Sequence, residues 1–292
     1  MLWQTTRFVL DLQRPRVMGI VNVTPDSFSD GGAHEGVAAA IAHCERLLLE
    51  GVDVLDVGGE STRPGAAAID VQTEWRRIEP VLRVALTLGV PVSVDTRRVE
   101  VMRRALDLGV DIINDVQALT ASGALELLAG HRSAGVCLMH MRGEPQTMAT
   151  LCDYQDLCAE VRAYLAERAA AARAAGIEAA RIVLDPGYGF AKTPEQNWEL
   201  LRGQRGLLAL GYPLLVGWSR KRALGELTGR AVGERLPGSL AAALAAVSHG
   251  ARVLRVHDVA ATVDALKVWA AAGGPGLGEN THLSGNTGAC SQ

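Results

Sequence analysis

Eight short apolar runs, each followed by a longer amphipathic stretch, constrain the fold of this chain more than any other feature of its sequence. The runs are rich in valine, isoleucine and leucine and show little alternation, which is typical of parallel strands covered on both faces. They lie at residues 16–23, 53–58, 90–95, 111–115, 134–140, 181–185, 213–217 and 251–257. Among the helices that follow them, four are expected at residues 37–50, 72–88, 99–108 and 154–175. Eight strand–helix units predict a closed (β/α)8 TIM barrel, with an open doubly wound sheet as the alternative.

The length of the chain suits one such barrel. It has 292 residues, and a barrel of this kind needs about 250. Residues 1–15 precede the first strand and are expected to form a hairpin or cap across the barrel bottom. Residues 16–272 would form the barrel itself. Residues 273–292 are rich in glycine, asparagine, serine and threonine, so a disordered tail is expected there.

Composition narrows the class of function. The net charge is only −3 and 48% of the residues are hydrophobic, so no broad attraction for nucleic acid or an anionic membrane is expected. The five cysteines form no CxxC pair, which indicates a reduced protein without a zinc site or a disulfide framework. The N-terminus is too charged for a signal peptide, and no apolar run approaches the length of a membrane span. We therefore expect a cytoplasmic protein.

The strand ends carry an unusual series of residues. Seven of the eight predicted strands close with a polar or charged residue or a glycine, and in a barrel these junctions share the face where active sites are built. The residues are Asn22, Gly58, Asp95, Asn114, Asp185, Gly217 and His257. The sequence therefore predicts an active site at the C-terminal ends of the strands.

Asp95, Asn114 and Asp185 end the third, fourth and sixth of these strands. Any one of them could simply cap the next helix. Three together are better explained by a ligand with several N–H donors, because a carboxylate can accept two hydrogens from a flat heterocycle at once. Such a site would reject ligands that lack those groups.

Two loops and the last strand offer groups for an anion or a metal. Residues 22–32, NVTPDSFSDGG, hold several oxygen donors, which suit Mg²⁺ or an anion, although a solvated turn is an equally good interpretation. Residues 56–66, DVGGESTRPGA, offer two glycines for close backbone approach, then Thr62 and Arg63. Arg255 and His257 are two residues apart and should point the same way. With Asn22 and Arg63 they make a plausible diphosphate clamp, and a buried Arg255 needs a ligand or a carboxylate to neutralise it.

The segments after the sixth and seventh strands add aromatic and basic residues. In DPGYGFAK (185–192), glycines make a turn that carries Tyr188, expected in the core, and Phe190, which could stack on a planar ligand. Residues 219–222 look like a basic cluster, in which Lys221 could donate to a heterocycle and Arg222 is expected to be solvated. His140 has no adjacent nucleophile and is interpreted as structural.

Together these motifs resemble one family, the dihydropteroate synthases. The match covers nearly the whole barrel, in the order of the family. The matching segments are NVTPDSFSDGG, DVGGESTRPGA, SVDT (93–96), IINDV (112–116), LMHM (138–141), LDPGYGFAK (184–192), GWSRK (217–221), RLPGSLA (235–241) and RVHDV (255–259). Departures are small: Tyr188, Ala191 and Trp218 differ from common family residues and affect only local pocket shape.

The resemblance implies a role for each matching position. The residues implied to hold the pterin ring are Asp95, Asn114, Asp185 and Lys221, with Met139, Phe190 and Gly217 lining the pocket and Arg255 stacking on the ring. Those implied for the diphosphate are Asn22, Arg63 and His257, with Asn22 and Asp30 as Mg²⁺ contacts. Those implied around 4-aminobenzoate, where sulfonamides also bind, are Phe28, Thr62, Pro64, Gly189, Phe190, Ser219 and Lys221. The catalytic set would be Asn22, Arg63, Asp95, Lys221, Arg255 and His257, in a homodimer.

The implied reaction joins (7,8-dihydropterin-6-yl)methyl diphosphate to 4-aminobenzoate, with Mg²⁺ assisting loss of diphosphate before the arylamine attacks. Two alternatives remain open. A methyltetrahydrofolate:corrinoid methyltransferase would share the pterin pocket but has no use for a diphosphate clamp. A non-catalytic pterin-binding module could lose Arg63 or His257, and both are present. No insertion is apparent near Phe190 or in the first two loops, so ordinary sulfonamide sensitivity is expected.

Overall fold

The parallel barrel is closed. The computed structural model describes residues 1–24, 33–62 and 65–275. Its barrel strands are β3 (Arg16–Asn22), β4 (Val54–Gly58), β5 (Val92–Asp95), β6 (Ile112–Asp115), β7 (Gly135–Met139), β8 (Ile182–Asp185), β9 (Leu214–Val216) and β10 (Ala251–Val256). They pair in chain order, and β10 closes the ring against β3. This confirms the predicted TIM barrel and excludes the open sheet.

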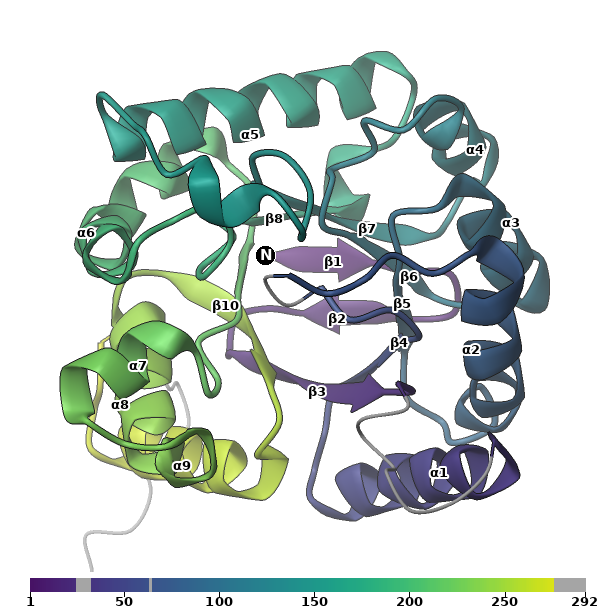
Figure 1. Cartoon of the computed structure of the whole chain (residues 1–292), viewed down its shortest axis with the longest axis horizontal. Helices are drawn as coiled ribbons and strands as arrows, with labels where there is room; N and C mark the ends of the chain where they lie inside the picture. Colours follow the sequence, from purple (N-terminus) through teal and green to yellow (C-terminus); the bar gives the residue numbers. More distant parts are fainter. Residues whose placement is uncertain (25–32, 63–64, 276–292) are drawn as a thin grey trace, which may run out of the picture.

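Helices surround the barrel in chain order (Figure 1). They are α1 (Ala33–Leu49), α2 (Val71–Ala85), α3 (Val99–Leu108), α4 (Ala124–Gly130), α5 (Leu157–Ala174), α6 (Pro194–Gly203), α7 (Arg222–Thr228), α8 (Leu236–Ser248) and α9 (Val259–Ala271). The outward side chains of the strands and the inward side chains of the helices share one large apolar cluster. Among the described residues, no helix is both long enough and apolar enough to cross a membrane.

Local sequence signals account for several helix ends. Helix α2 begins after Asp70, whose side chain accepts a hydrogen bond from the backbone N–H of Thr73. Helix α3 ends at Leu108 and is capped by Gly109, which adopts φ +97° in the left-handed region. Its bounds agree with the predicted helix at 99–108, whereas α1 begins four residues before the predicted start.

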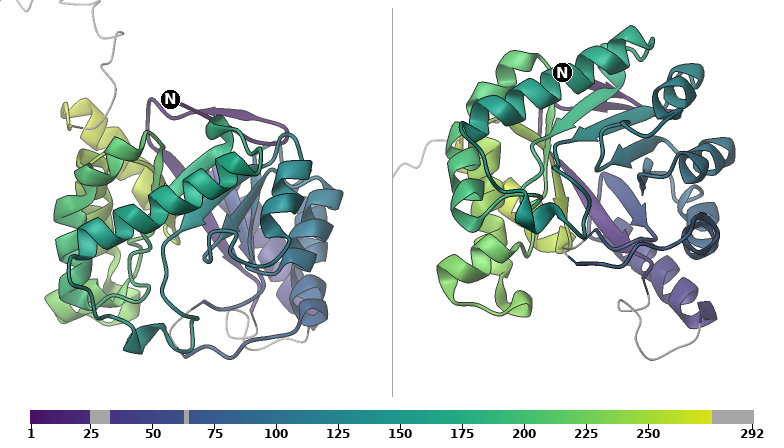
Figure 2. Two further views of the ribbon diagram at one scale, coloured as in Figure 1. Left: turned by 90° about the horizontal axis from the view of Figure 1, so that it is seen from above. Right: turned by 45° about the horizontal axis from the view of Figure 1, so that its top comes forward.

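An antiparallel hairpin fills one end of the barrel. Strands β1 (Leu2–Gln4) and β2 (Val9–Asp11) pair with each other and lie across the end opposite the long loops after β4 and β7 (Figure 2). Trp3 is fully buried, and its Nε1–H donates to the carbonyl of Arg181 at 3.0 Å. It packs against the lowest inward-facing layer of the strands, which contains Met18, Val54, Ile112, Cys137, Val183, Leu215 and Val253.

The inward-facing residues change from apolar to polar along the barrel axis. Side chains on a strand return to the same face every second residue. Two positions beyond the apolar layer, Ile20 and Met139 are still apolar, whereas Asp56, Asn114, Asp185 and Arg255 are polar or charged and Gly217 has no side chain. The barrel therefore has an apolar end closed by the hairpin and a polar end formed by the C-terminal ends of the strands.

Candidate active site

A buried group of acids around one arginine lies at the polar end of the barrel. Arg255 of β10 donates from Nε to Asp56 Oδ2 and from Nη2 to Asp95 Oδ2, each at 2.6 Å. Asp56 Oδ2 also accepts from Asn114 Nδ2 at 3.3 Å. Strands β4, β5, β6 and β10 thus supply one connected network. The expectation that a buried Arg255 needs a neutralising partner is met by carboxylates of the protein itself.

The acids retain unused hydrogen-bonding capacity. Asp56 Oδ1 and Asp95 Oδ1 are buried and have no hydrogen-bond partner among the described residues. Burial raises the pKa of Asp95 to about 7, with Arg255 opposing and Asp56 reinforcing the shift. Burial also raises the pKa of Asp185 to about 6, against a 2.7 Å hydrogen bond from the N–H of Gly187. A ligand with N–H donors would satisfy the open oxygens and favour the ionised carboxylates.

The turn after β8 brings an aromatic ring against a lysine. Gly187 and Gly189 have φ of +70° and +80°, which residues with a side chain rarely adopt. A Cβ at Gly189 would lie 2.9 Å from Cδ of Lys221. The Nζ of Lys221 stands 4.3 Å from the ring centroid of Phe190, within cation–π range. The turn and the segment after β9 therefore form one wall of the mouth.

Other residues at and near this turn are buried in the core. Tyr188 is buried, and its hydroxyl donates to Gln204 Oε1 at 2.8 Å, as expected for a core residue. His140 is buried beside Lys192, with 3.0 Å between Nδ1 and Nζ. Burial lowers the pKa of His140 to about 2. This neutral, buried ring agrees with its interpretation as structural.

His257 lies just beyond β10 and is paired with Ser219. Its Nδ1 is 3.0 Å from the Ser219 hydroxyl, and its backbone N–H donates to that oxygen at 3.2 Å. Burial lowers the pKa of His257 to about 3. Without a ligand this imidazole is neutral at pH 7, so it could meet an anion through a hydrogen bond rather than a charge.

The basic cluster predicted at residues 219–222 is wrong as a cluster. Arg220 pairs with Asp258, with Nη2 and Oδ1 2.6 Å apart, and Arg222 pairs with Glu226 four residues on along α7. Arg222 is exposed, as expected. Consecutive residues in this turn point in different directions, so only Lys221 reaches Phe190.

Gly59 lies in close contact with α2. A Cβ there would come 2.8 Å from Cγ2 of Ile78 and 3.0 Å from the carbonyl of Glu74. The close approach of α2 by itself therefore accounts for a glycine at this position.

The remaining predicted residues divide into described and undescribed ones. Asn22 ends β3 and is half-buried, Thr62 is half-buried in the loop after β4, and Met139 is buried beside Met141. Gly217 follows β9 and lies near the backbone of Arg255. Several predicted positions lie outside the described residues, namely Phe28, Asp30, Arg63, Pro64 and most of the tail at 276–292.

Two residues of the site were missed by the sequence reasoning. Asp56 could have been found, because it lies on the inward face two residues before Gly58. Lys192 gave no such signal, since a lysine in a glycine-rich loop usually faces solvent. It is buried, and its Nζ donates to the carbonyls of Gly187 and Phe190 at 3.0 Å each. Burial lowers the pKa of Lys192 to about 7.

Comparison with known families and relatives agrees with this geometry. Residues 18–257 match the family model described as pterin binding enzyme. A dihydropteroate synthase of Neisseria meningitidis serogroup B is 54% identical over 278 residues, which cover 93% of this chain and 98% of that protein.

Solved structures of high similarity contain ligands. A Xanthomonas albilineans dihydropteroate synthase with 4-aminobenzoic acid aligns with TM-score 0.85 and 54% identity, over 91% of this chain and 95% of that one. A structure from the same organism in complex with 7,8-dihydropteroate aligns with TM-score 0.85 and 50% identity, over 94% and 99%. A Yersinia pestis dihydropteroate synthase in a sulfonamide drug complex aligns with TM-score 0.87 and 42% identity, over 93% and 99%.

Proposed function

The chain belongs to the dihydropteroate synthase family of pterin-binding enzymes, and we propose how its residues carry out the reaction of that family. It is a transferase that makes dihydropteroate. The bond to be broken joins the pterin methylene to a diphosphate oxygen, and the bond to be formed joins the same carbon to the nitrogen of 4-aminobenzoate. The proposal rests on the buried acids around Arg255, of which Asp56 and Asp95 each keep one oxygen without a hydrogen-bond partner among the described residues.

The pterin ring is assigned to the acid-rich side of the mouth. Asp95 and Asp185 would accept from its amino and ring N–H groups, and Asn114 and Lys221 would complete the contacts. Met139, Phe190 and Gly217 would line the pocket, with Arg255 against the ring. Carboxylates placed here would also stabilise positive charge on the ring as diphosphate departs, which is electrostatic preorganisation.

The diphosphate is assigned to Asn22, Arg63 and His257 on the opposite side. The C–O bond would break with both electrons leaving on the diphosphate oxygen. The arylamine nitrogen then attacks the methylene and releases one proton. Because an arylamine is neutral at pH 7, no strong general base is needed before the attack.

A magnesium ion fits this donor set as a partner of the substrate. The described residues contain no group of three or more histidine, cysteine, aspartate or glutamate side chains that could hold a metal by themselves. Mg²⁺ commonly binds through one or two protein oxygens together with substrate phosphates. We assign it to the Asn22 amide oxygen, with Asp30 as a further contact. When bound, the ion would neutralise charge on the leaving diphosphate.

The second substrate is assigned to the wall formed by the turn after β8 and the segment after β9. Gly189, Phe190, Ser219 and Lys221 belong to this wall, and Thr62 approaches from the loop after β4. Phe28 and Pro64 would complete the site. A sulfonamide resembles 4-aminobenzoate in shape and charge, so we propose that it competes here with ordinary potency.

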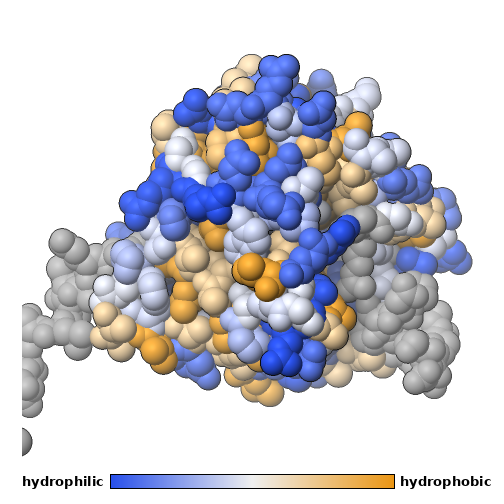
Figure 3. All heavy atoms as spheres, turned by 60° about the vertical axis from the view of Figure 1, so that its left-hand side comes forward, coloured by the Kyte–Doolittle hydropathy of each residue, from blue (hydrophilic) through white to orange (hydrophobic). Residues whose placement is uncertain are grey.

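We also propose that the protein is a cytoplasmic homodimer. Figure 3 shows the face formed by α6, α7 and α8, where hydrophobic residues gather between hydrophilic ones. Leu227 and Val232 are exposed on this part of the molecule. A second copy of the chain would remove such a surface from water. Light scattering of the purified protein should then give twice the mass of the chain.

The decisive experiment is direct. The protein is incubated with pterin methyl diphosphate, 4-aminobenzoate and Mg²⁺, and release of diphosphate is followed together with formation of dihydropteroate. Asn22→Ala should reduce turnover about 100-fold, because it removes both a metal and a diphosphate contact. Full turnover in that variant would refute the assignment of Asn22 to the diphosphate and the metal. Binding of the pterin without any diphosphate release would indicate a non-catalytic binding module.

A further inference from the structure

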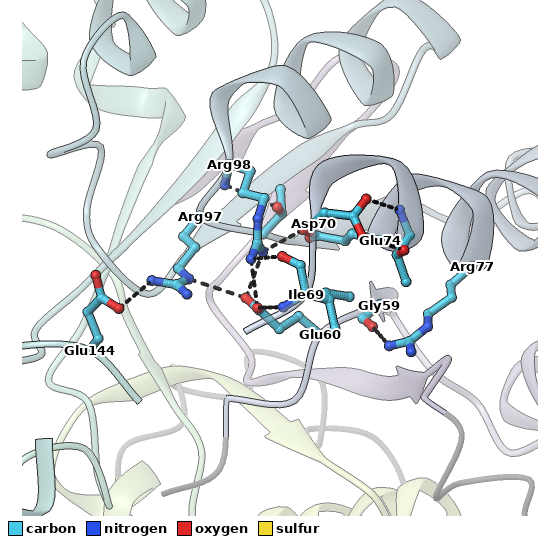
Figure 4. Close-up of polar contacts among 11 residues, drawn as sticks. Gly59, Glu60, Ile69, Asp70, Glu74, Arg77, Arg97, Arg98 and Glu144 are labelled. Atoms are coloured by element: carbon cyan, nitrogen blue, oxygen red, sulfur yellow. Dashed lines mark hydrogen bonds and ion pairs between the residues drawn. The ribbon is translucent and has the colours of Figure 1, made fainter. Parts of the chain in front are cut away.

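A buried ion pair closes the base of the loop between β4 and α2. This loop begins at Gly59, ends at Asp70 and carries Thr62. Glu60 stands at its start and Ile69 at its end. Figure 4 shows Arg98, from the beginning of α3, pointing between these two residues. We call Glu60 and Arg98 the loop clamp.

The contacts of the clamp tie the two ends of the loop together. Glu60 Oε1 accepts the backbone N–H of Ile69 at 3.1 Å. Arg98 donates to Glu60 in a bidentate manner, from Nη1 to Oε2 and from Nη2 to Oε1, each at 2.8 Å. The same Nη2 also donates to the carbonyl of Ile69. One guanidinium thus fixes both ends of a loop whose anchor residues are nine positions apart.

The clamp is anchored to the helices behind it. Arg98 Nη1 reaches Glu74 Oε2 of α2 at 2.7 Å, and the Glu74 side chain is fully buried. Arg77 of the same helix donates from Nη1 to the carbonyl of Gly59 at 2.9 Å. The base of the loop is therefore held in place by contacts with α2 and with the residue that precedes α3, and both helices pack on the barrel.

The burial of this pair and the geometry of its hydrogen bonds favour arginine over lysine at position 98. The side chains of Glu60 and Arg98 are only 7% and 16% exposed. Burial alone would raise the pKa of Glu60, but hydrogen bonds from Arg98 and Ile69 hold it below the ordinary value. Lysine carries the same charge but cannot make the bidentate contact and reach the Ile69 carbonyl at once.

A second bridge connects the loop to its neighbour across the mouth. Arg97 reaches Glu60 Oε2 from Nε at 3.2 Å and Glu144 Oε2 from Nη1 at 3.5 Å. The N–H of Gly65 donates to the carbonyl of Pro145 at 3.1 Å. The loops after β4 and β7 are thus held side by side next to the clamp.

We propose that Glu60 and Arg98 are positioning residues for 4-aminobenzoate, because they hold the loop that presents Thr62 to that substrate. The inference rests on the proposed function, which assigns Thr62 to the second site. The contacts assigned to the pterin ring come from strand ends and do not depend on this loop, whereas Arg63, which belongs to the loop, is assigned to the diphosphate. Loss of the loop clamp should therefore impair binding of 4-aminobenzoate and spare binding of a pterin that lacks the diphosphate, which loss of a purely structural ion pair would not do.

The test compares Arg98→Lys and Glu60→Gln with Arg104→Lys as the matched control. Arg104 lies on α3, the helix that Arg98 precedes, and its side chain bonds to Glu100 at 2.9 Å and to Gln72 at 3.1 Å, neither of which belongs to the loop clamp. Both clamp variants should raise KM for 4-aminobenzoate about tenfold. The Kd of a pterin without the diphosphate, measured by calorimetry, should stay within about twofold of the wild-type value. Hydrogen exchange over residues 65–70 should become faster in both variants, and the control should match the wild type throughout.

Several outcomes would overturn the inference. Equal losses of affinity for 4-aminobenzoate and for the pterin without its diphosphate, or a lower melting temperature with an unchanged KM for 4-aminobenzoate, would leave the loop clamp with a structural role only. If Arg98→Lys fails to fold, Glu60→Gln alone decides, because it retains the size of the side chain. A wild-type protein that releases no diphosphate would refute the proposed function instead, and the two failures are thereby distinguished.

Discussion

At the scale of single residues, the mouth of the barrel contains buried carboxylates whose ionised form is disfavoured in the free protein. A ligand that donates hydrogen bonds to them would favour that ionised form. Asp185 is buried and its pKa is raised to about 6 by that burial, although Lys221, Lys192 and Arg255 lie near enough to oppose the shift. Asp95 behaves likewise, with a pKa of about 7. Carboxyl groups with pKa values shifted in this way are common at functional sites.

Asp185→Asn should therefore stabilise the free protein while weakening pterin binding. The folded-state pKa lies above the unfolded value of 3.8, so the stability contributed by Asp185 is present below that value and lost as pH rises through about 6. At pH 8 the variant should gain about 1–3 kcal/mol in the free energy of unfolding, and this gain should shrink at pH 5. Its affinity for the pterin should fall at least about tenfold.

Denaturant unfolding and calorimetry at the two pH values would measure both effects. In the wild type, pterin affinity should decline as pH falls below about 7, because Asp95 and then Asp185 become protonated. Asp107→Asn, at an exposed position of α3, is the control and should change neither quantity. If Asp185→Asn gains less free energy of unfolding over wild type at pH 8 than at pH 5, the predicted direction of the pH dependence is contradicted.

At the scale of elements, the turn between β8 and α6 depends on backbone conformations that only glycine adopts freely. Gly187 has φ +70°, and a Cβ there would approach the carbonyl oxygen of His140 to 2.0 Å. Lys192 closes the same turn by donating to the carbonyls of Gly187 and Phe190. Strain at this point would be transmitted to Phe190 and Lys221, which form the wall of the second site.

Gly187→Ala should destabilise the protein by more than about 2 kcal/mol, because left-handed strain and a backbone clash add together. The KM for 4-aminobenzoate should also rise. Gly211→Ala is the matched control, since Gly211 has φ +79° but open space around its Cβ position. It should cost about 1 kcal/mol and leave both KM values unchanged. Equal effects of the two substitutions on KM would contradict the proposed link between the turn and the site.

At the scale of the whole molecule, the barrel separates stability from chemistry along its axis. Its lower end is an apolar layer closed by Trp3, and its upper end is the polar network around Arg255. Gly135 allows this closure, because a Cβ there would lie 3.0 Å from Nε1 of Trp3. Changes at the lower end should therefore alter stability alone.

Trp3→Ala should lower the free energy of unfolding by about 3–5 kcal/mol through the cavity that it leaves. The kcat/KM values of the folded protein should remain those of the wild type. Leu2→Ala, next along the strand but 56% exposed, should cost less than about 0.5 kcal/mol. Denaturant unfolding and steady-state kinetics on the same samples provide the comparison, and a changed kcat/KM in Trp3→Ala would show that the two ends are coupled.

The sequence by itself determined the barrel, its eight strands and the series of polar residues that closes them. These features are local: a run of β-branched residues predicts a strand, and the residue that follows the run lies at its end. The barrel topology then brings those ends to one face whatever their separation along the chain. For that reason Asp95, Asn114 and Asp185 could be placed together from the sequence alone, with Arg255 expected on the same face in the group that would bind the diphosphate.

Only the tertiary structure decided which groups pair. Arg255 binds Asp56, 199 residues away, and Asp95, 160 residues away, and nothing in a local pattern selects these partners from the other acids. Similarly, Lys192 is buried although its neighbours resemble a solvated turn, and Arg220 is occupied by Asp258 although its neighbours resemble a basic cluster. Side-chain pairing depends on distances across the closed barrel, and these arise only when all eight strands have met.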